Sequence, residues 1–438
     1  MLRTGLRVVR RAPGEVQVGT DPRWAVRVDD LTPDEERALV ALGQGLPLAL
    51  AAAELDPQRL AHLTDQLRQA GLTAPGGARA LPGAAGDDAR VLSLLDPDSA
   101  GAARVLRRAH RTVGVVGLGA TGLGIAVTLA AAGVGRVLLD DDRPVRSGDV
   151  GPGGYRFQDV GHGRVAAAVG VLAAVAPATT AVATAAGVAP GEESGGPSAG
   201  ADLVVVVSDD VVAPSLGALL LNRATPHLSV VLREADTVVG PLVAPGTGPC
   251  LRCLDLHRTD ADPAWPVVAD ALGTHARGVA TGHGPGLAAG LAAGLAAGIT
   301  VGRAAGPATS AAATGRPGTR PSPPEPPAVV GVAVGIAAAA VLAFLDTGTC
   351  ALGGTTVEIG LPDALPRRRR WAVHPACGCT AHRGITVTDD APGTARPEHD
   401  VDLSVDTPEG GPADADVRPR GSCADGLAHA SSGRPRRR

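Results

Sequence analysis

A glycine-rich turn between two apolar runs is the stretch best suited to chemistry. The run from Val113 to Val116 is typical of a buried strand, and a G-x-G-x-x-G turn opens directly from it into an Ala/Leu-rich segment. The glycines of this turn are Gly117, Gly119 and Gly122. Glycine lets the backbone approach a phosphate, and the N–H groups that begin the next helix are free to bind it. Asp140 ends the second apolar run, where a carboxylate can accept hydrogen bonds from ribose hydroxyls. The pattern predicts a nucleotide-binding βαβ unit, with a purely structural unit as the alternative.

Two short cysteine motifs form a second candidate site. The first is a C-x-x-C motif with Cys250 and Cys253, and the second is a C-x-C motif with Cys377 and Cys379. Four thiolates from two such motifs can close a tetrahedral zinc site, whose role is structural because no coordination position stays open. The C-x-C spacing departs from the usual C-x-x-C, so His374 is an alternative ligand. Unliganded thiols and a redox pair are the other readings.

The composition narrows the class of protein. The chain has 438 residues, 45% of them hydrophobic, which leaves room for two or three domains with a sizeable core. All 40 basic residues are arginines, and the net charge of −4 gives no electrostatic basis for binding nucleic acid. The Arg-rich N-terminus lacks the apolar core of a signal peptide, and six cysteines do not resemble a secreted disulfide framework. We therefore expect a cytoplasmic protein.

One apolar segment is long enough to raise the question of a membrane. The stretch from Ala328 to Leu345 carries no charge, but half of it is alanine and glycine, and Asp346 follows it without a basic flank. These features favour a buried helix over a membrane span, so we expect no membrane partner.

The order of the predicted elements indicates an α/β protein with appended segments. Residues 1–74 read as a small winged-helix-like unit, in which Thr32 begins a capping box with Glu35. Residues 75–97 are Gly/Ala/Pro-rich and read as a linker. Strands and helices alternate over 98–382, including a buried strand from Leu203 to Val207 that leads into Ser208, Asp209 and Asp210. We therefore predict a doubly wound, mainly parallel, Rossmann-like sheet. This domain contains a Pro-rich loop at 307–327, and the tail at 383–438 is predicted to be disordered.

With these pieces in order, the chain resembles the superfamily of ThiF, MoeB and the ubiquitin-activating enzymes. The resemblance covers roughly Arg104 to His382 and rests on the glycine loop, the acidic strand ends and the two cysteine motifs. It implies an adenylyltransferase that uses ATP and Mg²⁺ to activate the C-terminal carboxylate of a small ubiquitin-like protein or peptide. It further implies a homodimer and, as is common in bacterial members, a structural zinc ion held by four cysteines.

The resemblance also assigns roles to individual residues. Nucleotide binding is implied for Gly117, Gly119 and Gly122, and for Asp140 followed by Asp142 in the family's D-x-D pattern. Asp209 falls on the metal-binding acid, with Asp210 in place of the usual asparagine. Arg164 replaces a lysine of the family's G-x-x-K motif, which keeps the positive charge but changes its geometry. The resemblance thus implies that Asp209 and Arg164 carry the catalysis.

One family motif is missing from the chain. Relatives carry Ser-Asn-Leu-x-Arg-Gln, whereas Ser147 is followed here by Gly148 and later by Gly151, without the amide or the phosphate-binding arginine. Arg146 and Arg156 are nearby substitutes. Relatives can also use an arginine from the partner subunit's N-terminal helix, and the candidates for it are Arg104, Arg107, Arg108 and Arg111. The chain shows no convincing thioester cysteine, since Cys350 lies on a different element.

Other functions compete with adenylation. A catalytically degenerate scaffold would bind a precursor or leader peptide for a partner enzyme, and the opening unit is similar to the peptide-holding modules of such systems. A nicotinamide-dependent oxidoreductase would explain the glycine loop but not the cysteine motifs or Asp209. At the level of residues, Asp209 and Asp210 could cap the next helix, and Arg164 could be a solvated helix residue.

Overall fold

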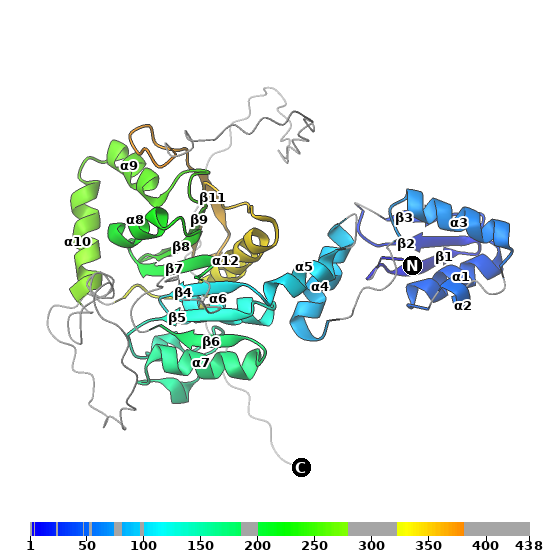
Figure 1. Cartoon of the computed structure of the whole chain (residues 1–438), viewed down its shortest axis with the longest axis horizontal. Coiled ribbons are helices and arrows are strands. Elements are labelled where there is room, and N and C mark those ends of the chain that lie inside the picture. The colour runs from blue at the N-terminus through cyan, green and yellow to red at the C-terminus, as the bar shows by residue number, and fades with distance from the viewer. Residues whose placement is uncertain are drawn as a thin grey trace, which may run out of the picture. The chain divides into compact units, whose positions relative to one another are not determined.

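The computed structural model describes residues 2–380 apart from 4, 23–24, 47, 52–54, 74–80, 97–99, 185–199 and 279–321. The predicted tail at 383–438 and residues 307–321 of the predicted Pro-rich loop therefore lie outside the described residues. Figure 1 shows the chain. The described residues of its opening unit form three strands and three helices. These are β1 (Val8–Ala12), β2 (Glu15–Val18), β3 (Val26–Val28), α1 (Pro33–Gly43), α2 (Leu48–Ala51) and α3 (Pro57–Gln69).

The opening unit is an antiparallel meander packed against helices. Its sheet has the order β1-β2-β3, and the apolar side chains of β2 pack with those of α1 and α3. The predicted capping box is present, because Thr32 Oγ1 accepts from Glu35 N and a Glu35 carboxylate oxygen accepts from Thr32 N. The hairpin of β1 and β2 was not predicted, although Pro13 and Gly14 mark its turn.

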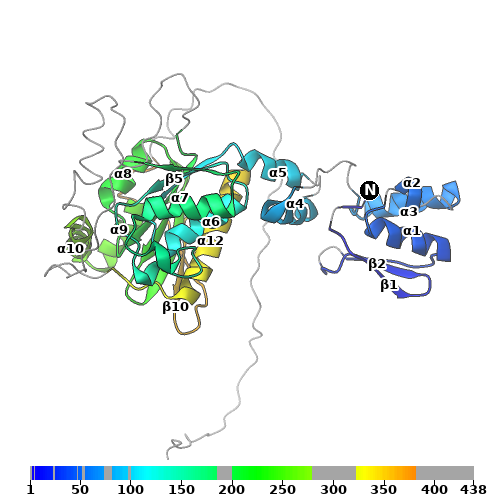
Figure 2. The same ribbon diagram turned by 90° about the horizontal axis from the view of Figure 1, so that it is seen from below.

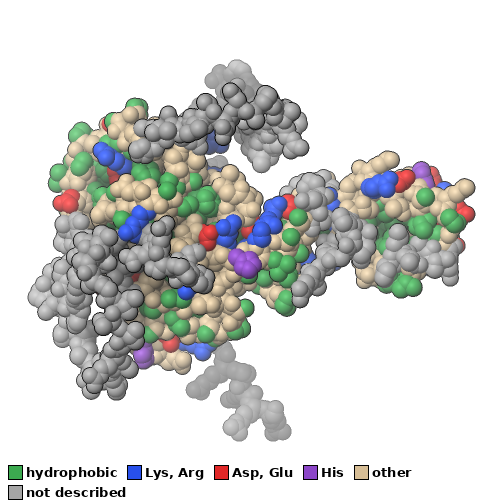
Figure 3. Space-filling model, in the orientation of Figure 1, with side chains coloured by type: hydrophobic (Ala, Val, Ile, Leu, Met, Phe, Trp, Pro, Cys, Tyr) green, Lys and Arg blue, Asp and Glu red, His purple; other side chains and the backbone are tan. Residues whose placement is uncertain are grey.

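Two helices occupy the region before the central sheet. They are α4 (Gly83–Leu95) and α5 (Gly101–Arg108), so residues 83–95, which we expected to be linker, are helical. Their contact uses small residues: a Cβ on Gly101 would lie 2.5 Å from the Ala89 carbonyl oxygen and 2.3 Å from Ser93 N. Few large apolar groups are needed for such a close approach, which explains why the composition resembled a linker. Over these helices, acidic and basic side chains lie close together (Figure 3).

The central domain is built on an eight-stranded sheet with the order β11-β10-β9-β8-β7-β4-β5-β6. The strands from β8 to β6 are parallel, and β9, β10 and β11 extend the sheet antiparallel. The strands are β4 (Thr112–Val116), β5 (Arg136–Asp140), β6 (Thr180–Ala183), β7 (Leu203–Asp209), β8 (His227–Leu232), β9 (Asp236–Val243), β10 (Thr355–Gly360) and β11 (Arg367–Arg370). The mainly parallel α/β sheet that the sequence predicts is therefore confirmed.

Helices cover both faces of this sheet (Figures 1 and 2). The helices are α6 (Ala120–Ala131), α7 (Arg164–Val175), α8 (Pro214–Asn222), α9 (Leu251–Ala261), α10 (Trp265–Gly278) and α12 (Pro327–Thr347). The side chains of β7 are buried on both faces of the sheet. Val205 and Val207 belong to the core under α6, α7 and α12, whereas Val204 and Val206 face Leu220 of α8. A strand buried on both sides reads as a continuous apolar run, as the sequence of β7 does.

The uncharged run before Asp346 forms α12, the buried helix that the sequence favours. It lies against α6 and β9, and in the turned view of Figure 2 the two helices run side by side. A Cβ on Gly124 of α6 would come within 2.8 Å of Val334 of α12, so the glycine permits this packing. By length and hydropathy α12 could also cross a membrane, but most of its apolar side chains are part of the main core or pack against it.

Candidate functional site

The glycine loop joins β4 to α6 and is shaped by backbone contacts that exclude side chains. Gly117 has φ +83°, and a Cβ there would lie 2.2 Å from the Val207 carbonyl oxygen. A Cβ on Gly122 would lie 1.8 Å from the carbonyl oxygen of Gly117. Both positions therefore require glycine. The loop lies at the carboxyl ends of β4, β5 and β7, which are neighbours in the parallel sheet. Ligands of open α/β sheets bind at this edge.

The backbone of the glycine loop is hydrogen-bonded by an aspartate that the sequence analysis did not single out. Asp141 has a side chain only 2% exposed, and its Oδ2 accepts from Leu118 N at 2.7 Å. The two acids that were singled out lie on either side of it: Asp140 is buried at the end of β5, and Asp142 is exposed. The three consecutive aspartates thus face different environments, and the middle one contacts the glycine loop.

Arg143 is the second functional candidate that the sequence did not reveal. Its Nε and Nη2 donate to the two carboxylate oxygens of Asp141 at 3.0 and 3.1 Å, and its Nη1 lies 3.3 Å from Asp209 Oδ2. The side chain is 29% exposed, so it is partly accessible to solvent. The suggested substitute Arg146 instead pairs with Asp149, and the other, Arg156, is exposed. The only available signal was the position of Arg143 directly after the acidic strand end.

Arg164 is fully buried at the start of α7. Its Nε and Nη2 donate to Asp149 Oδ2 at 3.0 and 2.6 Å, and its Nη1 donates to Asp141 Oδ2 at 2.9 Å. All three side chains are at most 2% exposed. The alternative of a solvated helix residue is therefore wrong, and a contact between Arg164 and phosphate stays a prediction. Asp149 follows Gly148 in the segment where the family motif is lost.

The arginines control the charge state of this cluster. Burial by itself would raise the pKa of Asp141, but the hydrogen bond from Arg143 and the charges of Arg143 and Arg164 lower it to about 2. Burial likewise opposes the charged form of both arginines, and the neighbouring carboxylates more than compensate, so the pKa of each guanidinium is raised. Burial also raises the pKa of Tyr155, whose hydroxyl lies 2.9 Å from the Leu118 carbonyl and 3.1 Å from that of Arg164.

Asp209 ends β7 beside the glycine loop, and its side chain is 21% exposed. The next residue, Asp210, has φ +60°, a left-handed conformation that asparagine and aspartate adopt more readily than other non-glycine residues. This backbone requirement explains how Asp210 can replace the asparagine of relatives. Helix α8 has Ala213 as its N-cap residue, so neither aspartate occupies the N-cap position. Carboxylate oxygens are the ligands that Mg²⁺ prefers, and Asp209 fits that role chemically.

The arginines suggested as contributions from a partner subunit mostly have partners within the chain. Arg104 pairs with Asp96, Arg111 with Asp202, and buried Arg108 with Asp88 and Asp346. Arg107 is exposed.

The four cysteines of the two motifs converge at the start of α9. Cys250 Sγ lies 3.5 Å from Cys377 Sγ, Cys253 Sγ lies 3.5 Å from Cys379 Sγ, and all four sulfurs lie within 4.8 Å of one another. A tetrahedral zinc ion with bonds of about 2.3 Å places its sulfur ligands about 3.8 Å apart. The donor set and its spacing therefore fit a structural zinc site.

His374 lies beside the cysteines but is engaged elsewhere. Its Nδ1 accepts from Ala376 N at 3.1 Å, and its Nε2 lies 2.8 Å from Asp260 Oδ2. The first contact leaves the ring proton on Nε2, which then donates to the carboxylate. His374 thus links α9 to the second cysteine motif, and the four sulfurs meet without it.

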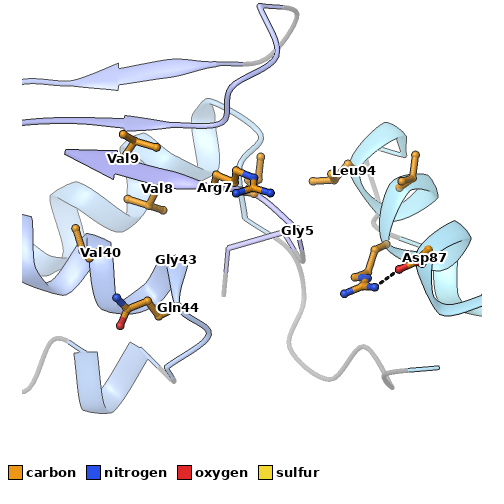
Figure 4. A pocket seen from close by; sticks show the side chains of 12 residues that line it. Gly5, Arg7, Val8, Val9, Val40, Gly43, Gln44, Asp87 and Leu94 are labelled. Atoms are coloured by element: carbon orange, nitrogen blue, oxygen red, sulfur yellow. Dashed lines mark hydrogen bonds and ion pairs between the residues drawn. The ribbon is translucent and has the colours of Figure 1, made fainter. Parts of the chain in front are cut away.

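A pocket lies apart from the sheet edge, between the opening unit and α4 (Figure 4). It measures about 710 Å³ and is lined by β1, the end of α1 and α4. Val8, Val40 and Leu94 line it, together with Arg7 and the ion pair of Arg90 with Asp87. Strand β1 is an edge of its sheet, and Val9 is 46% exposed. An extended peptide could pair with such an edge.

Comparison with known proteins decides the family. The model of the ThiF family matches residues 94–377, which contain the glycine loop, the Asp209 strand and three of the four clustered cysteines. The chain belongs to the ThiF family. No curated protein matches it.

Solved structures of this fold resemble the chain over most of its length. The E. coli MccB structure with ATP has a TM-score of 0.55 at 14% sequence identity, and the alignment covers 86% of this chain and 98% of that one. The E. coli MccB complex with AMPCPP and MccA has a TM-score of 0.56 at 15% identity, with coverages of 86% and 98%. PaaA has a TM-score of 0.53 at 16% identity, with coverages of 84% and 98%. At these identities the likeness establishes the fold.

Proposed function

We propose that this ThiF-family chain is an ATP- and Mg²⁺-dependent adenylyltransferase that activates the C-terminal carboxylate of a peptide or small ubiquitin-like protein. The observation that carries the proposal is the meeting of Arg143 with Asp141 and Asp209 beside the glycine loop. The Arg143 guanidinium and the Asp209 carboxylate therefore lie near the strand ends and the start of α6, where we expect a triphosphate to bind. The similarity to one MccB structure with ATP and to another with AMPCPP and MccA supports the same reading.

The chemistry required is attack of a carboxylate on the α-phosphorus, with departure of pyrophosphate. The new bond joins a substrate carboxylate oxygen to phosphorus as the bond to the β-phosphate oxygen breaks. Negative charge develops on the phosphate oxygens, and fixed cations and N–H donors stabilise it. Asp209 would hold Mg²⁺, which neutralises phosphate charge when bound. Arg143 would then be released from Asp209 to face the phosphates, while Arg164 keeps Asp141 and Asp149 in position.

Nucleotide binding and turnover can be tested with paired variants of the same strand. Calorimetry with ATP and Mg²⁺, compared with NAD, tests the ligand, and pyrophosphate exchange with synthetic peptides bearing free C-termini tests the reaction. Asp209→Asn should lower exchange by about a hundredfold or more. Asp202→Asn, just before the opposite end of β7, should leave it nearly unchanged. Binding of NAD without ATP, or exchange that is indifferent to Asp209→Asn, would refute the proposal.

A peptide-binding role for the opening unit is a second candidate function, favoured by the pocket beside β1. Its valines suit the apolar side chains of an extended peptide, and Arg7 suits an acidic one. This role is compatible with adenylation or with a non-catalytic scaffold. Val9→Asp in the full-length chain should weaken binding of a labelled peptide measured by anisotropy. The same substitution at exposed Val267, on α10, serves as the control. Equal affinity in both variants would exclude this surface.

A further inference from the structure

The glycine loop already receives a carboxylate from a distant part of the chain. Glu325 Oε2 accepts from Thr121 N, in the first turn of α6, at 2.7 Å. Its Oε1 lies so near Gly119 that a Cβ there would stand 2.4 Å away. The glycine thus makes room for the carboxylate, and an anion occupies the helix N-terminus at which the nucleotide phosphates are expected.

The backbone around Glu325 is constrained by four prolines. Pro323 and Pro324 precede the glutamate, Pro326 follows it as the N-cap residue of α12, and Pro327 begins that helix. Proline fixes its own φ and restricts the preceding residue to extended conformations. Pro323 is buried, which anchors the segment. Little backbone entropy remains to be lost when the carboxylate meets the loop, so the backbone that presents Glu325 is preorganised.

We propose that Glu325 competes with the phosphate groups of ATP for the glycine loop and thereby sets the affinity of the protein for nucleotide. This inference rests on the proposed function, because it assumes that ATP binds at the loop. Phosphate oxygens and the Glu325 carboxylate need the same N–H donors and repel each other at close range. The phosphates must therefore displace the glutamate side chain, and a weaker apparent affinity for ATP follows from that competition.

Glu325→Gln tests this competition because it removes the charge and keeps the shape. We expect the Kd for ATP with Mg²⁺, measured by calorimetry, to fall about tenfold, equivalent to about 1.4 kcal/mol. Glu325→Ala should also bind ATP more tightly. Glu358→Gln is the matched control, because Glu358 lies on β10, separated from β4 by β9, β8 and β7. Its Kd should equal that of the unmodified chain.

The outcomes separate this inference from the proposed function. If the unmodified chain binds ATP and both Glu325 variants bind it equally or more weakly, the competition is refuted while the ATP site stands. A higher Mg²⁺ requirement in Glu325→Gln would likewise overturn it, by showing that the carboxylate holds the metal. Absence of ATP binding in every variant would refute the proposed function and the competition with it. Tighter binding in the Glu325 variants alone supports the inference.

Discussion

The buried pair of Arg164 and Asp149 offers the sharpest test of how the site is held together. Two charge-assisted hydrogen bonds, at 3.0 and 2.6 Å, join the guanidinium to one carboxylate oxygen, and both side chains are 1% exposed. Asp149→Ala leaves Arg164 with Asp141 as its remaining acidic partner. Because breaking a buried pair from one side costs about 3 kcal/mol or more, we expect a loss of about 3 kcal/mol of unfolding free energy.

A double-mutant cycle separates the pair from its surroundings. Arg164→Met should also destabilise the chain, and the double variant should be more stable than the sum of the two single changes predicts. The reason is that removing both partners leaves no buried charge unpaired, because Asp141 keeps Arg143 and Arg146 is exposed. The coupling energy should therefore be about 1.5–3 kcal/mol. Urea unfolding at pH 7, with unchanged m-values, measures it. Additive effects, within about 0.5 kcal/mol, would show that the two charges do not stabilise each other.

Three further predictions concern charge and metal. Asp141→Asn should lower the free energy of unfolding by about 2 kcal/mol at pH 7, because the pKa of Asp141 is depressed from 3.8 to about 2 in the folded chain. The difference in unfolding free energy from the unmodified chain should therefore narrow as the pH falls below about 4. A difference measured by urea unfolding that is constant down to pH 3 would contradict this. Asp346→Asn should lower the free energy of unfolding by about 3 kcal/mol in the same measurement, because it weakens the buried pair with Arg108. Asp87→Asn, which weakens the exposed pair with Arg90, should lower it by less than about 0.5 kcal/mol. Cys377→Ser should abolish stoichiometric zinc, measured by elemental analysis, and lower the melting temperature, while Cys350→Ser should retain the metal; equal zinc in both variants would rule out the four-cysteine site.

The sequence predicts those parts of the site whose residues are close together along the chain. The glycine loop and the aspartate at the end of β7 each depend on neighbours in sequence, so their residue types are informative by themselves. Glu325 and Thr121 are 204 positions apart, and no local pattern can report such a contact. Arg143 was missed for a related reason, since its role depends on Asp209 meeting it across the sheet edge.

The fold likewise has elements that local sequence patterns predict and elements that depend on tertiary contacts. The strands and capped helices followed apolar periodicity and turn chemistry, whereas α4 lacks a strong apolar stripe and forms by close packing of small residues on α5. Tertiary contact with α5 therefore adds to the helix propensity of its alanines and leucines. Gly148 and Gly151 have open space around their Cα atoms, so the loss of the family's asparagine and arginine is not imposed by crowding.

The meeting of the two cysteine motifs constrains the part of the chain that lies between them. Cys250 and Cys377 are 127 positions apart, and the intervening chain carries α12 and Glu325. A link between the ends of a loop this long lowers the entropy of the denatured chain by the equivalent of about 4–5 kcal/mol at room temperature when the link is permanent. A bound metal would act in the same sense. If α12 separates from the sheet by partial unfolding, the segment between the two cysteine motifs would then stay tethered at both ends. The Glu325 carboxylate would therefore return to the glycine loop each time the domain refolds.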